Sequence, residues 1–155
     1  MSDKTKTEIL KGKLDPAKIS IVDFKIIKGQ IDSPEDFNNN DVTGHNFTAD
    51  FSLAFNLVDK LVKADFNIDI ETKSKKENKI ESKGSFHFIF IYKVENLNEL
   101  VTVKKENSID LNGGLGNALA SITHSTSRGI LLTRLQGTTL HNFILPIINP
   151  NDLLK

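Results

Sequence analysis

FTADFSLAFNLV, residues 47–58, carries the strongest periodic signal in the chain. Apolar residues stand at every second position from Phe47 to Leu57, and most of the residues between them are polar. Because the side chains of a β-strand alternate between the two faces of a sheet, this stretch predicts a strand with one buried face. A tight turn near Asp59 leads to a second alternating stretch, residues 62–70, so the two stretches predict neighbouring antiparallel strands.

A further strand is predicted downstream, in KIESKGSFHFIFIYKV at residues 79–94. The apolar residues on one of its faces are Ile80, Phe86, Phe88, Phe90 and Tyr92. Its other face gains Ile89 and Ile91, and a strand that is apolar on both sides is expected to be covered on both sides, by its own chain or by a partner. The charged segment KSKKENK, residues 73–79, is expected to be a solvated hairpin tip.

A fourth strand is predicted upstream of this meander. Residues 19–27 are rich in β-branched side chains, and their apolar positions change phase within the stretch, which predicts a β-bulge. Residues 29–46 consist largely of turn formers and predict a long connection. A connection of more than about a dozen residues tends to be functional or mobile.

A helix is predicted after the sheet. Its apolar residues at helical spacing are Leu115, Ala118, Leu119 and Ile122. Gly137 is a plausible stop, because glycine adopts the left-handed conformation that often ends a helix. GGLG, residues 113–116, is expected to be a hinge into the helix, because it lacks the lysine and the spacing of a phosphate-binding loop.

One face of this helix is made of small residues. They are Ala118, Ser121, Ser125 and Gly129. Such a face lets another backbone approach closely, and a glycine within a helix costs about 1 kcal/mol relative to alanine unless packing offsets it. The pattern therefore favours a contact between helices of an oligomer. The alternative is a poor helix that breaks at Gly129.

These elements predict an α+β protein in which a four-stranded antiparallel sheet is followed by a long helix packed on one face. The 155 residues fit one domain, which would bury roughly 70% of its unfolded surface. We assign residues 18–155 to this domain and residues 1–17, which are polar and rich in lysine, to a flexible N-terminal tail.

Composition excludes several classes of function. Twenty basic and twenty acidic residues balance, so charge gives no reason to expect nucleic acid or an anionic membrane as a partner. The absence of cysteine excludes disulfides, thiolate catalysis and cysteine-ligated zinc. No apolar stretch approaches the ~20 residues of a membrane span, and the N-terminal residues do not resemble a signal peptide. We therefore expect a cytoplasmic protein without membrane insertion.

The sequence offers no catalytic or metal-binding motif. The four histidines, His45, His87, His124 and His141, lie in different predicted elements and form no metal-spaced pair. No nucleophile elbow of the G-x-S-x-G type is present. We expect a protein that is not an enzyme and has neither a metal nor a cofactor.

The order of these elements resembles that of SecB, the bacterial protein-export chaperone family. The resemblance rests on ISIVDFKIIKGQIDSP at residues 19–34, GSFHFIFI at residues 84–91, Ser-Arg-Gly at residues 127–129 and LPIINPNDLL at residues 145–154. It covers most of residues 19–154. It implies an ATP-independent holdase that keeps unfolded polypeptides soluble and forms a homo-oligomer, a dimer or a tetramer. Several relatives serve toxin-antitoxin pairs, so the client would be a secretory precursor or one dedicated protein such as an antitoxin.

The resemblance also implies the location of the client groove. By position, the groove would be lined by Phe37, Val42 and Phe47 on one side and by Leu145, Ile147, Ile148, Leu153 and Leu154 on the other. Asp32 and Glu81 would retain part of an acidic patch that faces the export motor SecA. In NPNDLLK, Asn149 is expected to cap about one turn of helix that begins at Pro150.

Three alternatives stay open at this point. The groove residues could instead complete the core of the domain. The protein could be a non-enzymatic oligomeric adaptor that binds a folded partner through a face of the sheet. It could also bind a small ligand between the sheet and the helix.

Overall fold

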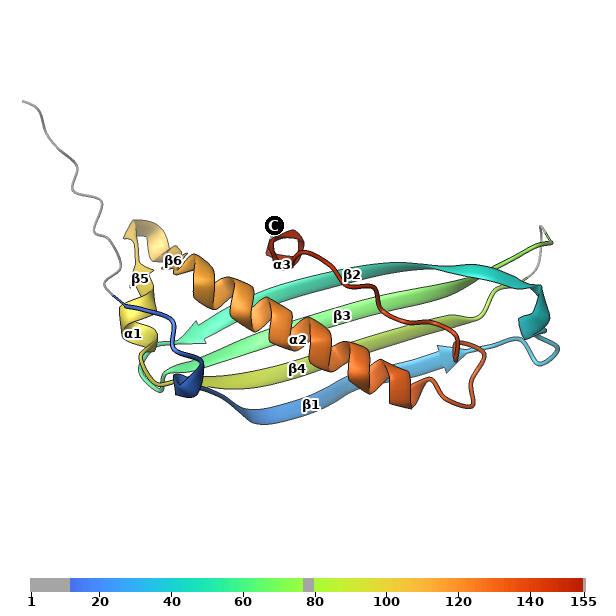
Figure 1. Ribbon diagram of the computed structural model, residues 1–155, viewed down its shortest axis with the longest axis horizontal. Coiled ribbons are helices and arrows are strands. Elements are labelled where there is room, and N and C mark those ends of the chain that lie inside the picture. The colour runs from blue at the N-terminus through green and yellow to red at the C-terminus, as the bar shows by residue number, and fades with distance from the viewer. Residues whose placement is uncertain (1–11, 77–79, 155) are drawn as a thin grey trace, which may run out of the picture.

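A computed structural model describes residues 12–76 and 80–154 of the chain (Figure 1). The strands are β1 (Ile19–Asp32), β2 (Val42–Asn56), β3 (Leu61–Ser74), β4 (Lys83–Val94), β5 (Val101–Val103) and β6 (Ile109–Leu111). The helices are α1 (Leu97–Leu100), α2 (Gly113–Arg134) and α3 (Pro150–Leu153), with short 3-10 turns η1 (Pro16–Lys18), η2 (Asn39–Asp41) and η3 (Lys105–Asn107). The predicted α+β class, with a four-stranded antiparallel sheet and one long helix, is confirmed.

The main sheet has the strand order β1-β4-β3-β2, and all its neighbours are antiparallel. Three strands form a meander, whereas β1 pairs with β4 at the opposite edge from β2. The chain therefore crosses the width of the sheet between β1 and β2 (Figure 1). The register of β1 shifts twice, between Ile21 and Asp23 and between Ile26 and Lys28, so the predicted bulge is present and a second one accompanies it.

The connection predicted for residues 29–46 is shorter than expected. β1 continues to Asp32, which lies opposite Lys83, and β2 begins at Val42, which lies opposite Ser74. Only residues 33–41 connect the two strands. The residues that favour turns are drawn into strands because a neighbouring strand offers hydrogen-bond partners, and strand preference depends strongly on such context.

Ile80 does not belong to the buried face of β4, and this prediction is wrong. The strand begins only at Lys83, and Ile80 is 78% exposed in the connection before it. The predicted hairpin tip of residues 73–79 begins inside β3, which ends at Ser74, and residues 77–79 lie outside the described part of the chain.

The inner face of the sheet forms the core. Its buried residues are Val62, Ala64, Phe66, Ile68 and Ile70 from β3 and Phe86, Phe88, Phe90 and Tyr92 from β4. They alternate with exposed or half-buried residues, as the sequence pattern predicts. α2 and the C-terminal segment both lie on this inner face (Figure 1). On the back face, Ile89 and Ile91 stay half-buried.

α2 is continuous through Gly129, so the alternative of a helix that breaks there is wrong. Its first turn is capped by the side chain of Asn112, which accepts a hydrogen bond from the backbone N–H of Leu115 at 3.2 Å. Gly137 follows the helix with φ of +76°, the left-handed conformation expected of a stop. Tyr92 ties α2 to the sheet through a buried hydrogen bond of 2.7 Å with Thr123.

The predicted N-terminal tail lies partly outside the described residues. Of its described residues, Leu14 packs partly against the core, and the backbone carbonyl of Lys13 accepts a hydrogen bond from the Asn96 side chain. Residues 16–18 form the turn η1, which leads directly into β1.

Candidate functional site

The C-terminal strap, defined here as residues 139–149, crosses the inner face of the sheet between the end of α2 and α3 (Figure 1). Its side chains fall into two groups. Leu140, Phe143 and Leu145 are buried in the core, whereas Ile144 and Ile147 are exposed, Ile147 by 87%. The strap is therefore an irregular segment that is anchored by a few apolar side chains.

Phe143 is the contact between the strap and β2. Its ring packs edge-on against the rings of Phe47, at 5.6 Å between centroids, and His45, at 5.5 Å. The Leu140 side chain packs directly on Gly84 of β4. A Cβ atom built on Gly84 would lie 2.6 Å from the Leu140 Cδ1 atom, so a larger residue would clash there. The floor of the strap is thus built by the inner faces of β2 and β4. We call this floor, together with the facing side of α2, the trough.

Polar ties hold the strap at its ends and near its middle. The Asn39 side chain donates a hydrogen bond of 2.8 Å to the carbonyl of Thr139, and the hydroxyl of Thr139 contacts that of Ser82. On the other side, the His124 Nε2 atom lies 2.7 Å from the carbonyl oxygen of Pro146. Within the described residues, this is the one hydrogen bond made by the backbone of residues 144–148.

Two histidines flank the strap, and burial lowers the pKa of both. Burial, followed by the charge of Arg128, lowers the pKa of His124 below its usual range. Burial, followed by His141, does the same for the pKa of His45. Neutral His124 donates its Nε2 proton to the Pro146 carbonyl, because a carbonyl oxygen can only accept.

Several polar atoms next to the strap are buried without a hydrogen-bond partner in the described part of the chain. They are His45 Nε2, His124 Nδ1 and Arg128 Nη1. A buried polar group without a partner costs about 1–3 kcal/mol. The docked strap therefore shields polar atoms whose hydrogen bonds it does not replace.

The predicted groove residues occupy different environments. Leu145 and Leu153 are buried, Ile148 is half-buried against the core, and Ile147 and Leu154 are exposed. On the opposite side, Phe47 meets the strap through Phe143. Phe37 in the crossover and Val42 at the start of β2 are half-buried. The structure thus brings Phe47 into contact with the strap, through Phe143 and not through a residue of the predicted groove.

The small-residue face of α2 points away from the sheet. Ala118 and Ser121 are half-buried, Ser125 and Gly129 are exposed, and no atom lies within 4 Å of a Cβ built on Gly129. Ser121 and Ser125 also line a small pocket together with Arg128 and Ile147.

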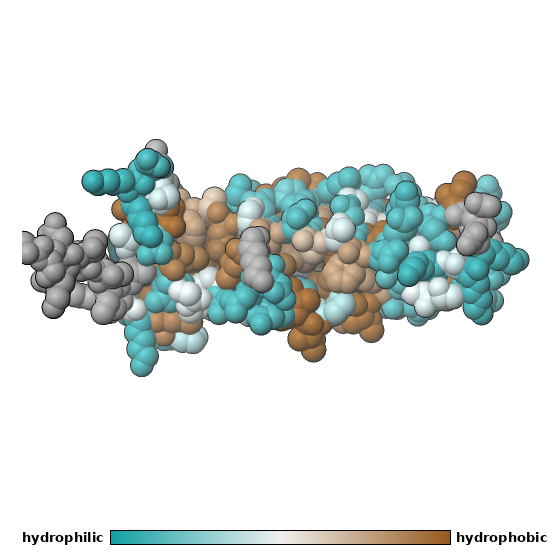
Figure 2. All heavy atoms as spheres, turned by 90° about the horizontal axis from the view of Figure 1, so that it is seen from above, coloured by the Kyte–Doolittle hydropathy of each residue, from teal (hydrophilic) through white to brown (hydrophobic). Residues whose placement is uncertain are grey.

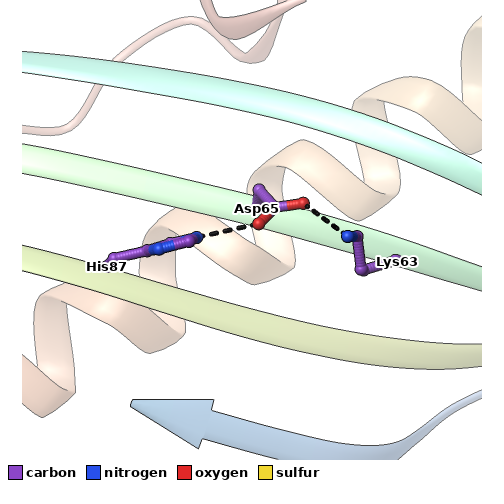
Figure 3. Close-up of polar contacts among 3 residues, drawn as sticks. All are labelled: Lys63, Asp65 and His87. Atoms are coloured by element: carbon purple, nitrogen blue, oxygen red, sulfur yellow. Dashed lines mark hydrogen bonds and ion pairs between the residues drawn. The ribbon is translucent and has the colours of Figure 1, made fainter. Parts of the chain in front are cut away.

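The back face of the sheet carries a network of charges beside the half-buried Ile89 and Ile91. Asp65 accepts from the His87 ring at 2.8 Å and pairs with Lys63 at 3.5 Å (Figure 3). Beside it, a depression of about 430 Å³ is lined by charged residues of three strands, namely Lys28, Asp32, Asp69, Glu71 and Lys83.

The two residues of the predicted acidic patch have different surroundings. Asp32 lines the back-face depression and accepts from the Gln30 side chain at 2.9 Å. Glu81 accepts hydrogen bonds from the Thr72 hydroxyl, which is on the buried side of β3, and from the backbone and hydroxyl of Ser74. The two carboxylates therefore do not share a face of the sheet.

Sequence reasoning missed the main anchors of the strap, Leu140 and Phe143, and the two histidines beside it. The sequence holds one signal that could have found them. Leu140, Phe143 and Leu145 are large apolar residues, and such residues tend to be buried, although their spacing repeats with neither two nor 3.6 residues.

The described residues, 12–76 and 80–154, include no group of three potential metal ligands close enough to hold an ion. Within the same residues, no helix is long and apolar enough to cross a membrane.

No family model matches this chain, and the search of curated proteins finds no match. Among solved structures, a SecB-like chaperone of Mycobacterium tuberculosis, in complex with a peptide from an antitoxin, aligns with a TM-score of 0.47 and 12% identity over 85% of this chain and 92% of that one. A protein of unknown function from Streptococcus agalactiae aligns with a TM-score of 0.36 and 15% identity over 83% of this chain and 97% of that one. At these values neither neighbour assigns an activity to this chain.

Proposed function

We propose that the protein is an ATP-independent holdase that binds exposed apolar segments of unfolded polypeptides in the cytoplasm. Its client would be a protein destined for export or one dedicated partner such as an antitoxin. One observation carries this proposal: an apolar trough on the inner face of the sheet is filled by the irregular strap, which docks mainly through side chains. The proposed activity is binding and not catalysis.

Apolar contacts suit such a role because they are not directional. A surface that buries phenylalanine and leucine side chains can accept similar side chains from many sequences, at about 25 cal/mol per Å² of apolar area buried. Figure 2 shows the molecule from the β2 edge of the sheet. Apolar side chains project there on the side that carries α2 and the C-terminal segment. Ile144 and Ile147 are among the exposed apolar residues of that segment.

The activity is tested by aggregation of a client. Purified protein should suppress the light scattering of reduced, unfolded α-lactalbumin when the two are mixed at near-stoichiometric ratio. Aggregation that continues unchanged in a large molar excess of the protein would rule the holdase function out.

We propose that the protein acts as a homo-oligomer, dimer or tetramer, which uses the outer face of α2. The support is the exposed small-residue face, where Gly129 leaves room for a second backbone. Gly129→Leu should lower the mass measured by analytical ultracentrifugation, whereas Asn98→Leu, at an exposed position of α1, should leave it unchanged.

An adaptor function is the second candidate, and the charged back face favours it. The network of Asp65, His87 and Lys63 and the adjacent depression offer fixed charges to a folded partner (Figure 3). An adaptor should bind one folded protein and ignore denatured ones. His87→Ala should weaken that binding and leave suppression of aggregation unchanged, because His87 does not touch the trough.

A further inference from the structure

We propose that the strap is an intramolecular occupant of the trough and that a client displaces it with two apolar side chains of an extended segment. This inference rests on the proposed holdase function and concerns the regulation of its binding surface. In the free protein the trough is closed by the chain itself. In the bound protein, the strap would be lifted between its two ends.

The strap presents the pattern that a client would have to match. Phe143 and Leu145 are two positions apart, both are buried, and Ile144 between them is 61% exposed. Alternate side chains of an extended chain point to opposite sides, so positions i and i+2 enter the trough together. A client segment with large apolar residues at i and i+2 reproduces these contacts without any fixed sequence.

The middle of the strap is held more weakly than its ends. At one end, Leu140 is buried and Thr139 is bonded by Asn39 and Ser82; at the other, Leu153 of α3 is buried. Between them, among the described residues, the backbone of residues 144–148 makes one hydrogen bond, from His124 to Pro146. A segment without backbone pairing opens locally at low cost, whereas its anchored ends keep it attached.

The docked strap also leaves hydrogen bonds unmade. His124 Nδ1 and Arg128 Nη1 on α2, and His45 Nε2 on β2, are buried without partners in the described chain. Lifting the strap lets water or the backbone of a client reach these atoms. Opening therefore uncovers polar groups of α2 and β2 that the backbone of a client can bond.

The absence of cysteine from the chain allows a direct test by thiol labelling. Leu145→Cys places a thiol under the strap, at a side chain that is 1% exposed, and Leu119→Cys places the matched control on the inner side of α2, at 0%. In the free protein, a thiol-specific reagent should modify the Leu145→Cys variant at least about tenfold faster than the Leu119→Cys variant. The reason is that α2 opens only when the whole domain unfolds. The global unfolding rate of each variant, measured by denaturant dilution, provides the baseline.

The second arm adds reduced, carboxymethylated α-lactalbumin, which is unfolded and has no free thiol. Binding is followed by the fluorescence anisotropy of a dye on the client. Bound client should speed the modification of Leu145→Cys further and leave Leu119→Cys unchanged.

Two results would overturn the inference. Equal modification rates in the two variants, both set by global unfolding, would show that the strap opens only with the domain. Client binding without faster modification of Leu145→Cys would place the client elsewhere. If the client does not bind at all, the holdase function is contradicted, and so is displacement of the strap by a client. The ratio of the modification rates of Leu145→Cys and Leu119→Cys in free protein still decides whether the strap opens.

Discussion

α2 and the strap cover the same inner face of the sheet in different ways. The 22 residues of α2 satisfy their backbone groups within the helix, so docking adds the burial of Leu115, Leu119 and Leu131 to a segment that is already paired. The strap has a few buried side chains, and in the described chain the backbone of its residues 144–148 makes one hydrogen bond. The difference teaches that α2 brings its own backbone pairing to the core, whereas the strap is held there mainly by buried side chains.

Shortening a core residue of α2 should have the largest effect. Leu119→Ala removes a side chain that is fully buried against the sheet, and it should lower the free energy of unfolding by about 2–5 kcal/mol. Urea denaturation measures the change. Leu132→Ala, on the exposed side of the same helix, should change stability by less than about 1 kcal/mol. Similar losses in both variants would mean that α2 does not pack as described.

The cap of α2 provides a smaller change in the same element. Asn112→Ala removes the acceptor of the Leu115 N–H and should cost about 1 kcal/mol of unfolding free energy. Asn112→Asp keeps a side-chain oxygen at this position and should retain most of the stability. A loss in Asn112→Asp as large as in Asn112→Ala would argue against the cap.

Breaking a tie of the strap should change local opening and leave global stability almost intact. Asn39→Ala removes the bond to the Thr139 carbonyl, which contributes about 0.5–1.5 kcal/mol. Hydrogen exchange measured by mass spectrometry should speed up in peptides from residues 139–149 and stay unchanged in peptides from α2. Asn40→Ala, at the exposed neighbouring position, is the matched control and should change neither.

Acid should weaken the strap as well. The pKa values of His45 and His124 are lowered in the folded protein, so the unfolded chain binds protons more readily than the folded chain. Stability is then fully present above the ordinary histidine value of about 6.5 and falls as the pH drops through it. Arg128 beside His124, and His141 beside His45, lower the pKa values of these two rings further. Urea denaturation at pH values above and below about 6.5 should show a lower free energy of unfolding on the acid side. The His124→Gln variant should lose less stability on acidification than the unchanged protein.

The sequence predicted the meander well because its side chains repeat with the period of the structure. The alternation in residues 47–58 and 62–70 identifies both strands and the inner side of each, although this side is buried in β3 and only partly buried in β2, which lies at the edge of the sheet. Boundaries were predicted less well. Residues 29–32 and 42–46 are poor strand formers, and they join β1 and β2 because β4 and β3 extend far enough to pair with them. The prediction for Ile80 was wrong for the opposite reason. Ile80 is in phase with Phe86, but the pairing of β4 with its neighbours begins only at Lys83.

The candidate site was predicted only in part. Phe47 and Leu145 were named from the resemblance, and the structure places both at the trough. Phe143 and Leu140 were not named, because a segment without periodicity gives no signal of which residues face inward. His45 and His124 were considered only as metal ligands, and their place beside the strap was not predicted. The assembly implied by the small face of α2 stays a prediction.

The amino-acid sequence by itself determined the strands, the long helix and the inner face, because each follows from a local repeat of two or 3.6 residues. Only the tertiary structure decided where the strap lies and which of its side chains are buried. That choice depends on surfaces contributed by β2, β4 and α2, which are far apart along the chain and become neighbours only in the folded protein. Local periodicity carries no information about such contacts, and for this protein they form the candidate functional site.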